Sequence, residues 1–489
     1  MAAETERSPS VDWKRILFIL LGFGLFLLIY YSPPWKEAVD PTGKAFPLTR
    51  EGKASIALFL MAGIWWVFEV VPIGVTSLAI GVMQSLFAIR PAKEAFRDFM
   101  DPSVMFIFGS VVIGLAFTKT GLTRRIAYRM LQIVGERTSI IVLGSLVLTA
   151  GLAHFMAHTA AAATVFPILL AINHLYGEGD RPTRFGKALF IGMAYAAGAG
   201  SIITFLGAAR GPAAAGMFKE FTGADIGFFD LPKYLFLIGW SMVLIIWAYL
   251  MLVLKPEKER IHGLKETVQE LSSELGPMSR DEKFVILCLI LVVIGMALQS
   301  FVPALKEWDR AAIMLVSTLL FFLFRVLTIK ELEDIPWNII LLFSGAMSIG
   351  FCLWRTGAAQ WMAVNWLVLF QKAHWMVFVL GIALFVLIMT NFIMNVAAIA
   401  ISLPVSLVIA KYLGVAPEVI LYASLVTAGM PFVLLIGAAP NAIAYESRQF
   451  TPGEFFKHGI FMSIILMVVL AGAIAFLWPF LGMPILLGK

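Results

Sequence analysis

The sequence predicts an all-α membrane protein that crosses a bilayer many times and is built from two related halves. Of the 489 residues, 60% are hydrophobic and only 14% are charged, which is more apolar surface than a water-soluble chain of this length buries. Several segments run for about 20 residues without a charge, the length that crosses a hydrocarbon core of roughly 30 Å. The clearest of these are residues 16–35, 234–254, 284–305 and 461–477.

The distribution of basic residues predicts which segments face the cytoplasm. The chain has 37 lysines and arginines against 31 acidic residues, a net charge of +6, and basic side chains concentrate in residues 119–137 and 255–283. Short basic loops stay on the cytoplasmic side of a membrane, so we place both segments there, with an amphipathic helix at about 264–275 in the second. Membrane topology therefore explains the basic balance without nucleic-acid binding.

Three blocks of residues recur in the same order in the two parts of the chain, each at a constant spacing. They pair 109–121 with 345–357, 155–167 with 392–404, and 207–209 with 437–439. One such match arises easily by chance, but three in the same order indicate a duplication. We therefore expect a first half at 1–254, a cytoplasmic linker at 255–283 and a second half at 284–489.

Each half contains two places where a membrane-spanning helix would be interrupted. They lie at 153–167 and 198–212 in the first half, and at the matching positions 390–404 and 429–441 in the second. Glycine and proline there free backbone groups that lipid cannot satisfy, so such breaks persist only where the backbone lines a cavity enclosed by protein. Paired interruptions in two halves predict the binding site of a transporter. In the alternative interpretation, the glycines only let helices pack closely.

Three segments carry a resemblance to a known family. Residues 65–76 resemble its tryptophan–glutamate–proline–threonine segment, and 335–345 resemble the counterpart of that segment in the second half. Residues 439–443 resemble the end of its threonine-proline-proline-asparagine loop. On these motifs the chain resembles, along nearly its whole length, a divergent member of the divalent anion:sodium symporter family of di- and tricarboxylate transporters.

This resemblance implies about eleven membrane spans, two re-entrant hairpins and an inverted repeat, in a homodimer that lies in the inner membrane of a bacterium. It also implies a scaffold domain and a transport domain that moves as an elevator. The scaffold spans would comprise about 15–90 and 284–327, and the transport parts about 103–254 and 336–489. The hairpins would lie at about 138–174, entering from the cytoplasm, and at about 375–412, entering from outside.

The chain departs from the family at both hairpin tips, where family members carry a serine-asparagine-threonine motif. The first tip reads Ala157-His158-Thr159 and the second reads Met394-Asn395-Val396. The two halves therefore depart unequally, because only the second keeps the asparagine. This inequality makes us expect different chemistry in the two halves.

The second half retains hard oxygen donors of the kind that a sodium ion prefers. The candidate sodium ligands are the hydroxyl of Thr390, the amide oxygen of Asn395 and the backbone carbonyls of Ile393 and Gly437. At the first-half positions that match Thr390 and Asn395, alanine and His158 have replaced the oxygen side chains. A neutral imidazole offers one nitrogen and a protonated one repels cations, so we expect the first sodium site to be absent or rebuilt.

The charges near the interruptions favour an anionic substrate. Arg210 lies in the first broken loop, where the family usually has proline, and its fork matches a carboxylate or sulfonate. Residues 138–176 and 375–415 contain no Asp or Glu, and interrupted helices add N-termini that attract anions. Arg210 could replace the missing sodium; alternatively, it snorkels to an interface or pairs with a carbonyl. The candidate substrate-binding residues are His158, Thr159, Arg210, Asn395, Val396 and Asn441.

These features predict secondary active transport of a small anion, with a dicarboxylate favoured, coupled to sodium through the second-half site. The alternatives are sodium-independent exchange, or proton coupling through His158, with sulfate or a sulfonate as the cargo. A non-transporting anion sensor is the alternative of another class. The sequence does not predict an enzyme, because the interrupted segments lack paired acids, and His154 and His158 without a third ligand make a poor zinc site.

Overall fold

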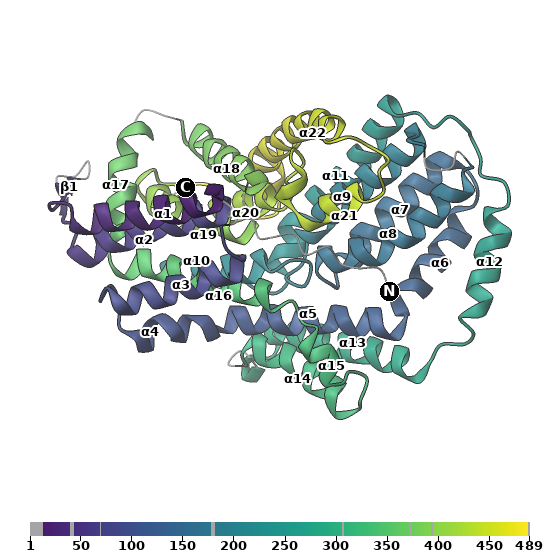
Figure 1. Cartoon of the computed structure of the whole chain (residues 1–489), viewed down its shortest axis with the longest axis horizontal. Helices are drawn as coiled ribbons and strands as arrows, with labels where there is room; N and C mark the ends of the chain where they lie inside the picture. Colours follow the sequence, from purple (N-terminus) through teal and green to yellow (C-terminus); the bar gives the residue numbers. More distant parts are fainter. Residues whose placement is uncertain are drawn as a thin grey trace. The chain divides into compact units, whose positions relative to one another are not determined.

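The computed structural model describes residues 13–39, 44–68, 70–177, 181–305, 308–370, 374–392 and 395–487 (Figure 1). Almost all regular structure in these ranges is helical, and eight of the helices are long and apolar enough to cross a membrane. Four shorter apolar helices accompany them. The prediction of an all-α, polytopic membrane protein is therefore confirmed.

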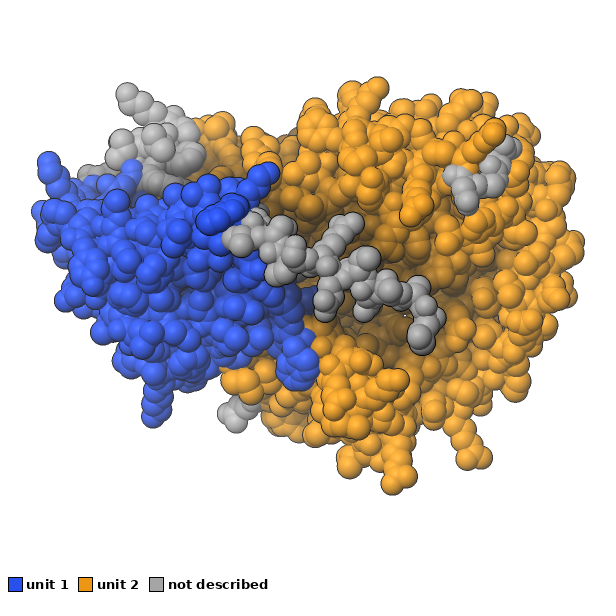
Figure 2. Space-filling view, viewed as in Figure 1, with its two compact units in different colours: residues 1–99, 337–365 blue, residues 100–336, 366–489 orange. Residues whose placement is uncertain are grey.

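The chain divides into two compact units, and the first comprises residues 1–99 and 337–365 (Figure 2). Its elements are α1 (Trp13–Tyr31), the antiparallel strands β1 (Ala38–Val39) and β2 (Ala45–Phe46), α2 (Arg50–Val67), α3 (Ile73–Leu86), α4 (Ala92–Arg97) and α16 (Trp337–Arg355). The short helix η1 (Asp98–Met100) and helix α17 (Ala358–Phe370) cross its boundaries. This unit therefore combines helices from both halves of the sequence.

Within the first unit, α3 and α16 pack closely although they come from different halves. Gly345 of α16 lies directly against Ser77 of α3, where a larger residue would clash. The side-chain amide of Gln84 donates to the Ser348 hydroxyl at 2.8 Å. Small residues at the interface and a hydrogen bond between helices are typical of helix association in membranes, where apolar surface alone supplies little driving force.

The second unit comprises residues 100–336 and 366–489. From the first half it contains α5 (Pro102–Thr120), α6 (Leu122–Val134), α7 (Thr138–Leu152), α8 (His158–Leu175), α9 (Arg184–Ser201), α10 (Arg210–Thr222) and α11 (Asp230–Val253). The linker forms α12 (Leu264–Glu274), where the sequence predicts an amphipathic helix. From the second half it contains α13 (Arg280–Phe301), η2 (Pro303–Leu305), α14 (Arg310–Leu323), α15 (Ile329–Glu333), α18 (Trp375–Phe392), α19 (Asn395–Tyr412), α20 (Pro417–Ala428), η3 (Leu435–Gly437), α21 (Ala439–Tyr445), α22 (Pro452–Gly472), the π-helical η4 (Ala473–Leu477) and α23 (Trp478–Phe480).

The predicted hairpin segments each contain two helices. Helices α7 and α8 contact each other, and so do α18 and α19. His158 is the first residue of α8, and Asn395 is the first residue of α19. Pro167 and Pro404 lie inside α8 and α19, so the helical interruption in each segment comes before the helix that contains the proline.

Helices of the two halves pack crosswise inside the second unit. Helix α10 of the first half contacts α19 and α20 of the second, and α21, the counterpart of α10, contacts α8 and α9 of the first. Such reciprocal contacts are expected when two repeats are related by a two-fold axis. The interrupted segments of both halves therefore meet inside one compact unit.

Candidate functional site

The first interrupted span consists of α9, a loop and α10, and its loop is held against the first helix pair. Gly207 lies against the carbonyl of Ala153, where no side chain would fit. The Gly207 carbonyl accepts a hydrogen bond from the backbone N–H of His158 at 3.0 Å. The Thr204 hydroxyl donates to the His154 carbonyl at 2.6 Å. These contacts place the tip residue His158 beside the broken loop.

The second interrupted span, formed by α20, a loop and α21, has the same construction. Gly437 lies against the carbonyl of Thr390, which is the counterpart of Ala153. The side-chain oxygen of Asn391 accepts hydrogen bonds from two successive backbone N–H groups of the loop, at 2.9 and 3.1 Å. Each broken loop is therefore fixed to the C-terminal end of the helix that precedes α8 or α19.

Three oxygen atoms converge at the end of α20. The Thr390 hydroxyl lies 3.0 Å from Asn395 Oδ1 and 3.1 Å from the Ala428 carbonyl. Thr390 and Asn395 are buried, with 0% and 8% of their surface exposed. When the single hydroxyl proton goes to the Ala428 carbonyl, lone pairs of Thr390 and Asn395 remain free. Oxygens this close together can share one small, hard cation, and we call these three atoms the oxygen cluster.

The oxygen cluster contains two of the four predicted sodium ligands, Thr390 and Asn395. The structure brings Thr390, Asn395 and Gly437 together, and Ile393 lies outside the described residues. The Ala428 carbonyl belongs to the cluster but was not predicted, because a backbone carbonyl leaves no mark in the sequence. The described residues hold no group of three His, Cys, Asp or Glu side chains placed for a metal. A cation here would be bound by neutral oxygens and stabilised by the negative end of the α20 dipole.

The equivalent place in the first half offers different groups. Ala153 stands where Thr390 supplies its hydroxyl, and His158 stands at the position of Asn395. The imidazole Nδ1 of His158 is buried without a hydrogen-bond partner. The side chains at this place therefore present a nitrogen and no oxygen, which suits a hard cation poorly.

Arg210, the first residue of α10, lies where the two interrupted spans meet. Its side chain is buried, with 2% exposed, and its Nη2 donates to the Ser201 hydroxyl at 2.6 Å. The same nitrogen lies close to Gly429, the residue that follows the Ala428 carbonyl of the oxygen cluster. Arg210 therefore does not snorkel to a surface. It reaches from the first broken loop to the end of α20.

The charge of Arg210 is not neutralised by a carboxylate in the ranges that the structure describes. Its Nε and Nη1 are buried without a hydrogen-bond partner, and its one bond is to a neutral hydroxyl. His158 lies within electrostatic range of the guanidinium. A buried charge without a counter-ion is unfavourable unless an anion pairs with it. The unpaired N–H groups are therefore positioned to bind the oxygens of an anion.

The remaining predicted substrate-binding residues take different places. Thr159 and Val396 lie in the first turns of α8 and α19, and Thr159 is half-buried whereas Val396 is buried. The side-chain nitrogen of Asn441 donates to two carbonyls of its own loop, at 2.8 and 3.0 Å. Asn441 thus stabilises the second broken loop. Arg210 likewise bonds to a residue of its own interrupted span, Ser201. Sequence reasoning did not single out Ser201, the partner of Arg210.

Comparison with known proteins identifies the family. Residues 44–484 match the sequence profile described as the sodium:sulfate symporter transmembrane region. The chain belongs to this family. The family membership expected from the sequence is therefore confirmed. The predictions of a multi-pass membrane protein that transports anions, and that is not an enzyme, are confirmed with it.

Two relatives from the family match almost end to end. The sodium-dependent dicarboxylate transporter SdcS of Staphylococcus saprophyticus is 25% identical over 503 residues, which cover 97% of this chain and 93% of the relative. SdcS of Staphylococcus aureus is 25% identical over 519 residues, which cover 99% of this chain and 94% of the relative. The similarity therefore includes both halves and the linker.

Two solved structures share the fold at low sequence identity. MtrF of Neisseria gonorrhoeae, described with a class of antimetabolite efflux pumps, has a TM-score of 0.59 at 14% identity and covers 96% of this chain and 95% of its own. The YdaH transporter of Alcanivorax borkumensis, described as having an unusual topology, has a TM-score of 0.53 at 12% identity and covers 96% and 98%. At these identities the likeness shows the fold alone.

Proposed function

We propose that this transporter carries a small dicarboxylate across the inner membrane of a bacterium and couples its movement to sodium. The arrangement at the end of α20 carries the proposal. The Ala428 carbonyl belongs to the oxygen cluster, and the next residue, Gly429, lies against the Arg210 guanidinium. A cation and an anion bound at these neighbouring places attract each other, so each raises the affinity for the other.

Five of the six candidate substrate-binding residues have a role in this proposal, and Asn441 stabilises the second broken loop. The Arg210 guanidinium binds one carboxylate of the substrate through its unpaired N–H groups. His158 and Thr159 lie at the N-terminus of α8, and Asn395 and Val396 at the N-terminus of α19, where helix dipoles favour negative charge. Asn395 is thus shared between the substrate and sodium. The naming of both SdcS relatives as sodium-dependent dicarboxylate transporters supports the choice of substrate and cation.

The architecture proposed with this function is that of an elevator. In it, α7–α8 and α18–α19 are re-entrant hairpins, two copies of the chain form a homodimer, and a transport domain moves against a scaffold. The scaffold comprises about 15–90 and 284–327, and the transport domain about 103–254 and 336–489. Cross-linking of engineered cysteine pairs, with one cysteine in each proposed domain, tests the movement. A protein in which the two domains do not move would form the same cross-links with and without sodium.

A second candidate function is sodium-independent exchange of a dicarboxylate, sulfate or a sulfonate. The first half favours it, because Ala153 and His158 supply no oxygen side chain and Arg210 brings a permanent positive charge. Coupling to protons through His158 is less well supported. A proton on His158 would place a second positive charge within range of Arg210, where the two repel each other.

Uptake by the purified protein in proteoliposomes tests the proposal. Radiolabelled succinate, sulfate and a small sulfonate are each offered in external sodium or in choline, with and without the same anion inside. We expect uptake of succinate that requires an inward sodium gradient and no internal anion. Uptake that is equally fast in choline and requires internal anion would establish exchange instead. Uptake driven by a proton gradient alone would establish coupling to protons.

A further inference from the structure

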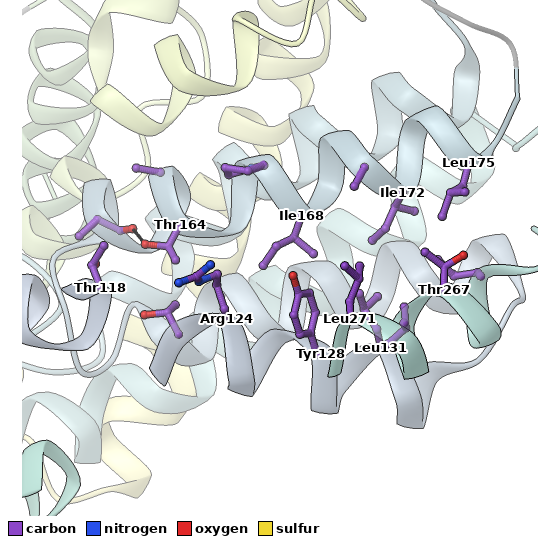
Figure 3. A pocket seen from close by; sticks show the side chains of 17 residues that line it. Thr118, Arg124, Tyr128, Leu131, Thr164, Ile168, Ile172, Leu175, Thr267 and Leu271 are labelled. Carbon is purple, nitrogen blue, oxygen red and sulfur yellow. Dashed lines mark hydrogen bonds between the residues drawn. The ribbon is translucent and has the colours of Figure 1, made fainter. Parts of the chain in front are cut away.

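A pocket of about 600 Å³, lined by none of the residues of the oxygen cluster, lies between α5, α6, α8 and the linker helix α12 (Figure 3). Its size is within the range of roughly 300–1,000 Å³ that is typical of small-molecule sites. Most of its length is apolar. Ile168 and Ile172 of α8 form one wall, and Leu131 of α6 and Leu271 of α12 form the other. The body of the pocket therefore suits a hydrocarbon chain.

One end of this pocket is polar and positively charged. Arg124 lies there with Thr118 and Thr164, whose hydroxyls donate to carbonyls of their own helices. Thr123, also in the lining, is 1% exposed, and its hydroxyl is buried without a hydrogen-bond partner. The exposed guanidinium of Arg124 and the unpartnered hydroxyl of Thr123 are hydrogen-bond donors in the same lining, and an oxygen-rich acceptor would satisfy both.

Hydrogen bonds on both sides of α12 attach the linker to the helices of the first half. Before α12, the Thr138 hydroxyl donates to the Lys258 carbonyl at 2.8 Å, and the Tyr176 hydroxyl donates to Glu257 at 3.1 Å. After α12, Arg125 donates to Glu282 at 2.7 Å from its Nε, and its other nitrogens donate to linker carbonyls. The pocket therefore lies between α8 and an anchored linker.

We propose that this pocket binds an anionic phospholipid, with one acyl chain along the apolar body and the phosphate on Arg124 and Thr123. Charge complementarity selects this occupant. A neutral lipid would offer no negative charge to the exposed guanidinium of Arg124, and a free phosphate would leave the apolar body empty. Helix α6 belongs to the basic segment that we place in the cytoplasm, and basic pockets between membrane helices on that side bind anionic headgroups.

Lipid binding to the purified full-length protein tests this proposal without any transport measurement. Phosphatidylglycerol, phosphatidylcholine with the same acyl chains, or inorganic phosphate is added in detergent. Thermal unfolding and native mass spectrometry then report binding. We expect phosphatidylglycerol alone to raise the Tm and to remain bound. Arg124→Gln should lower the affinity for it about tenfold or more, because charge-assisted hydrogen bonds are lost. Arg129→Gln changes the same charge on the same helix outside the pocket lining and should keep the affinity.

A second variant tests the apolar body of the pocket. Ala171 lies in the lining and has an exposed side chain, so Ala171→Trp fills the space with little effect on the folded core. It should abolish retention of phosphatidylglycerol, whereas Ile133→Trp, an exposed position outside the lining, should not. Three outcomes would overturn the proposal: equal binding of both lipids, equal losses in Arg124→Gln and Arg129→Gln, or full retention in a folded Ala171→Trp. If Ala171→Trp fails to fold, the two arginine variants decide.

Discussion

Replacement of Arg210 tests whether its guanidinium is the counter-charge of the transported anion. The side chain has one hydrogen bond, to Ser201, and two buried nitrogens without a partner. Truncating one partner of a buried, hydrogen-bonded charge pair costs roughly 2–5 kcal/mol, and the lower limit corresponds to about a 30-fold loss of affinity. Arg210→Ala should therefore weaken succinate binding by at least that factor. Arg210→Lys should recover only part of it, because an ammonium group lacks the planar fork.

The same variant should affect stability differently with and without the anion. A buried cation without a counter-ion destabilises the folded state, so Arg210→Ala should unfold at the same or a higher temperature than wild type in anion-free buffer. Succinate should then stabilise only the wild type. Ser201→Ala removes the bond but keeps the charge, and calorimetric titration should show a smaller loss of affinity. Unchanged affinity in a folded Arg210→Ala protein would refute this reasoning and leave Arg210 as a structural residue.

Three further predictions concern the oxygen cluster, the second broken loop and the linker. Asn395→Ala should reduce the sodium dependence of uptake much more than Ala157→Ser changes it, because Asn395 contributes an oxygen to the cluster; equal effects would contradict that role. Gly437→Ala should abolish uptake, because the added methyl would clash with the Pro431 side chain and crowd the end of α18. Gly381→Ala, whose methyl meets nothing, should preserve uptake; uptake by both variants would show that the loop tolerates the change. Burial raises the pKa of Glu282, but hydrogen bonds from its arginine partner and from the helix N-terminus outweigh this and hold it below the ordinary 4.5. The stability that the Glu282 carboxylate contributes is present above its unfolded pKa and is lost as the pH falls through the lower folded pKa. Below about pH 4.5 the Tm should therefore fall more in wild type than in Glu282→Gln. Parallel plots of Tm against pH for the two proteins would contradict this role of Glu282.

The sequence predicted the fold class and the position of two helix pairs because both depend on local properties. Long uncharged runs indicate membrane spans, and the predicted segments 138–174 and 375–412 coincide with α7–α8 and α18–α19. The crosswise packing of α10 on α19 and of α21 on α8 could not be predicted in this way. These contacts join segments far apart in the chain, and their glycines and apolar residues would suit many partners.

The candidate site was predictable only as far as side chains revealed it. Thr390 and Asn395 stood out as oxygen donors, and Arg210 as a charge in an apolar loop. Their partners did not stand out, because Ala428 contributes a backbone carbonyl and Ser201 is one of many serines. Asn441 shows the opposite case. Its side-chain nitrogen bonds within its own loop, a structural role that its residue type alone does not distinguish from substrate binding.

A cation at the oxygen cluster and an anion at Arg210 should bind cooperatively. The most direct measurement is the succinate affinity of the purified protein at increasing sodium concentration, with choline holding the ionic strength constant. We expect the affinity of wild type to rise with sodium. Thr390→Val removes the hydroxyl at nearly constant volume and should flatten that rise while keeping the weaker, sodium-free binding. A wild-type affinity that is independent of sodium, or a sodium dependence that survives in Thr390→Val, would contradict the claim.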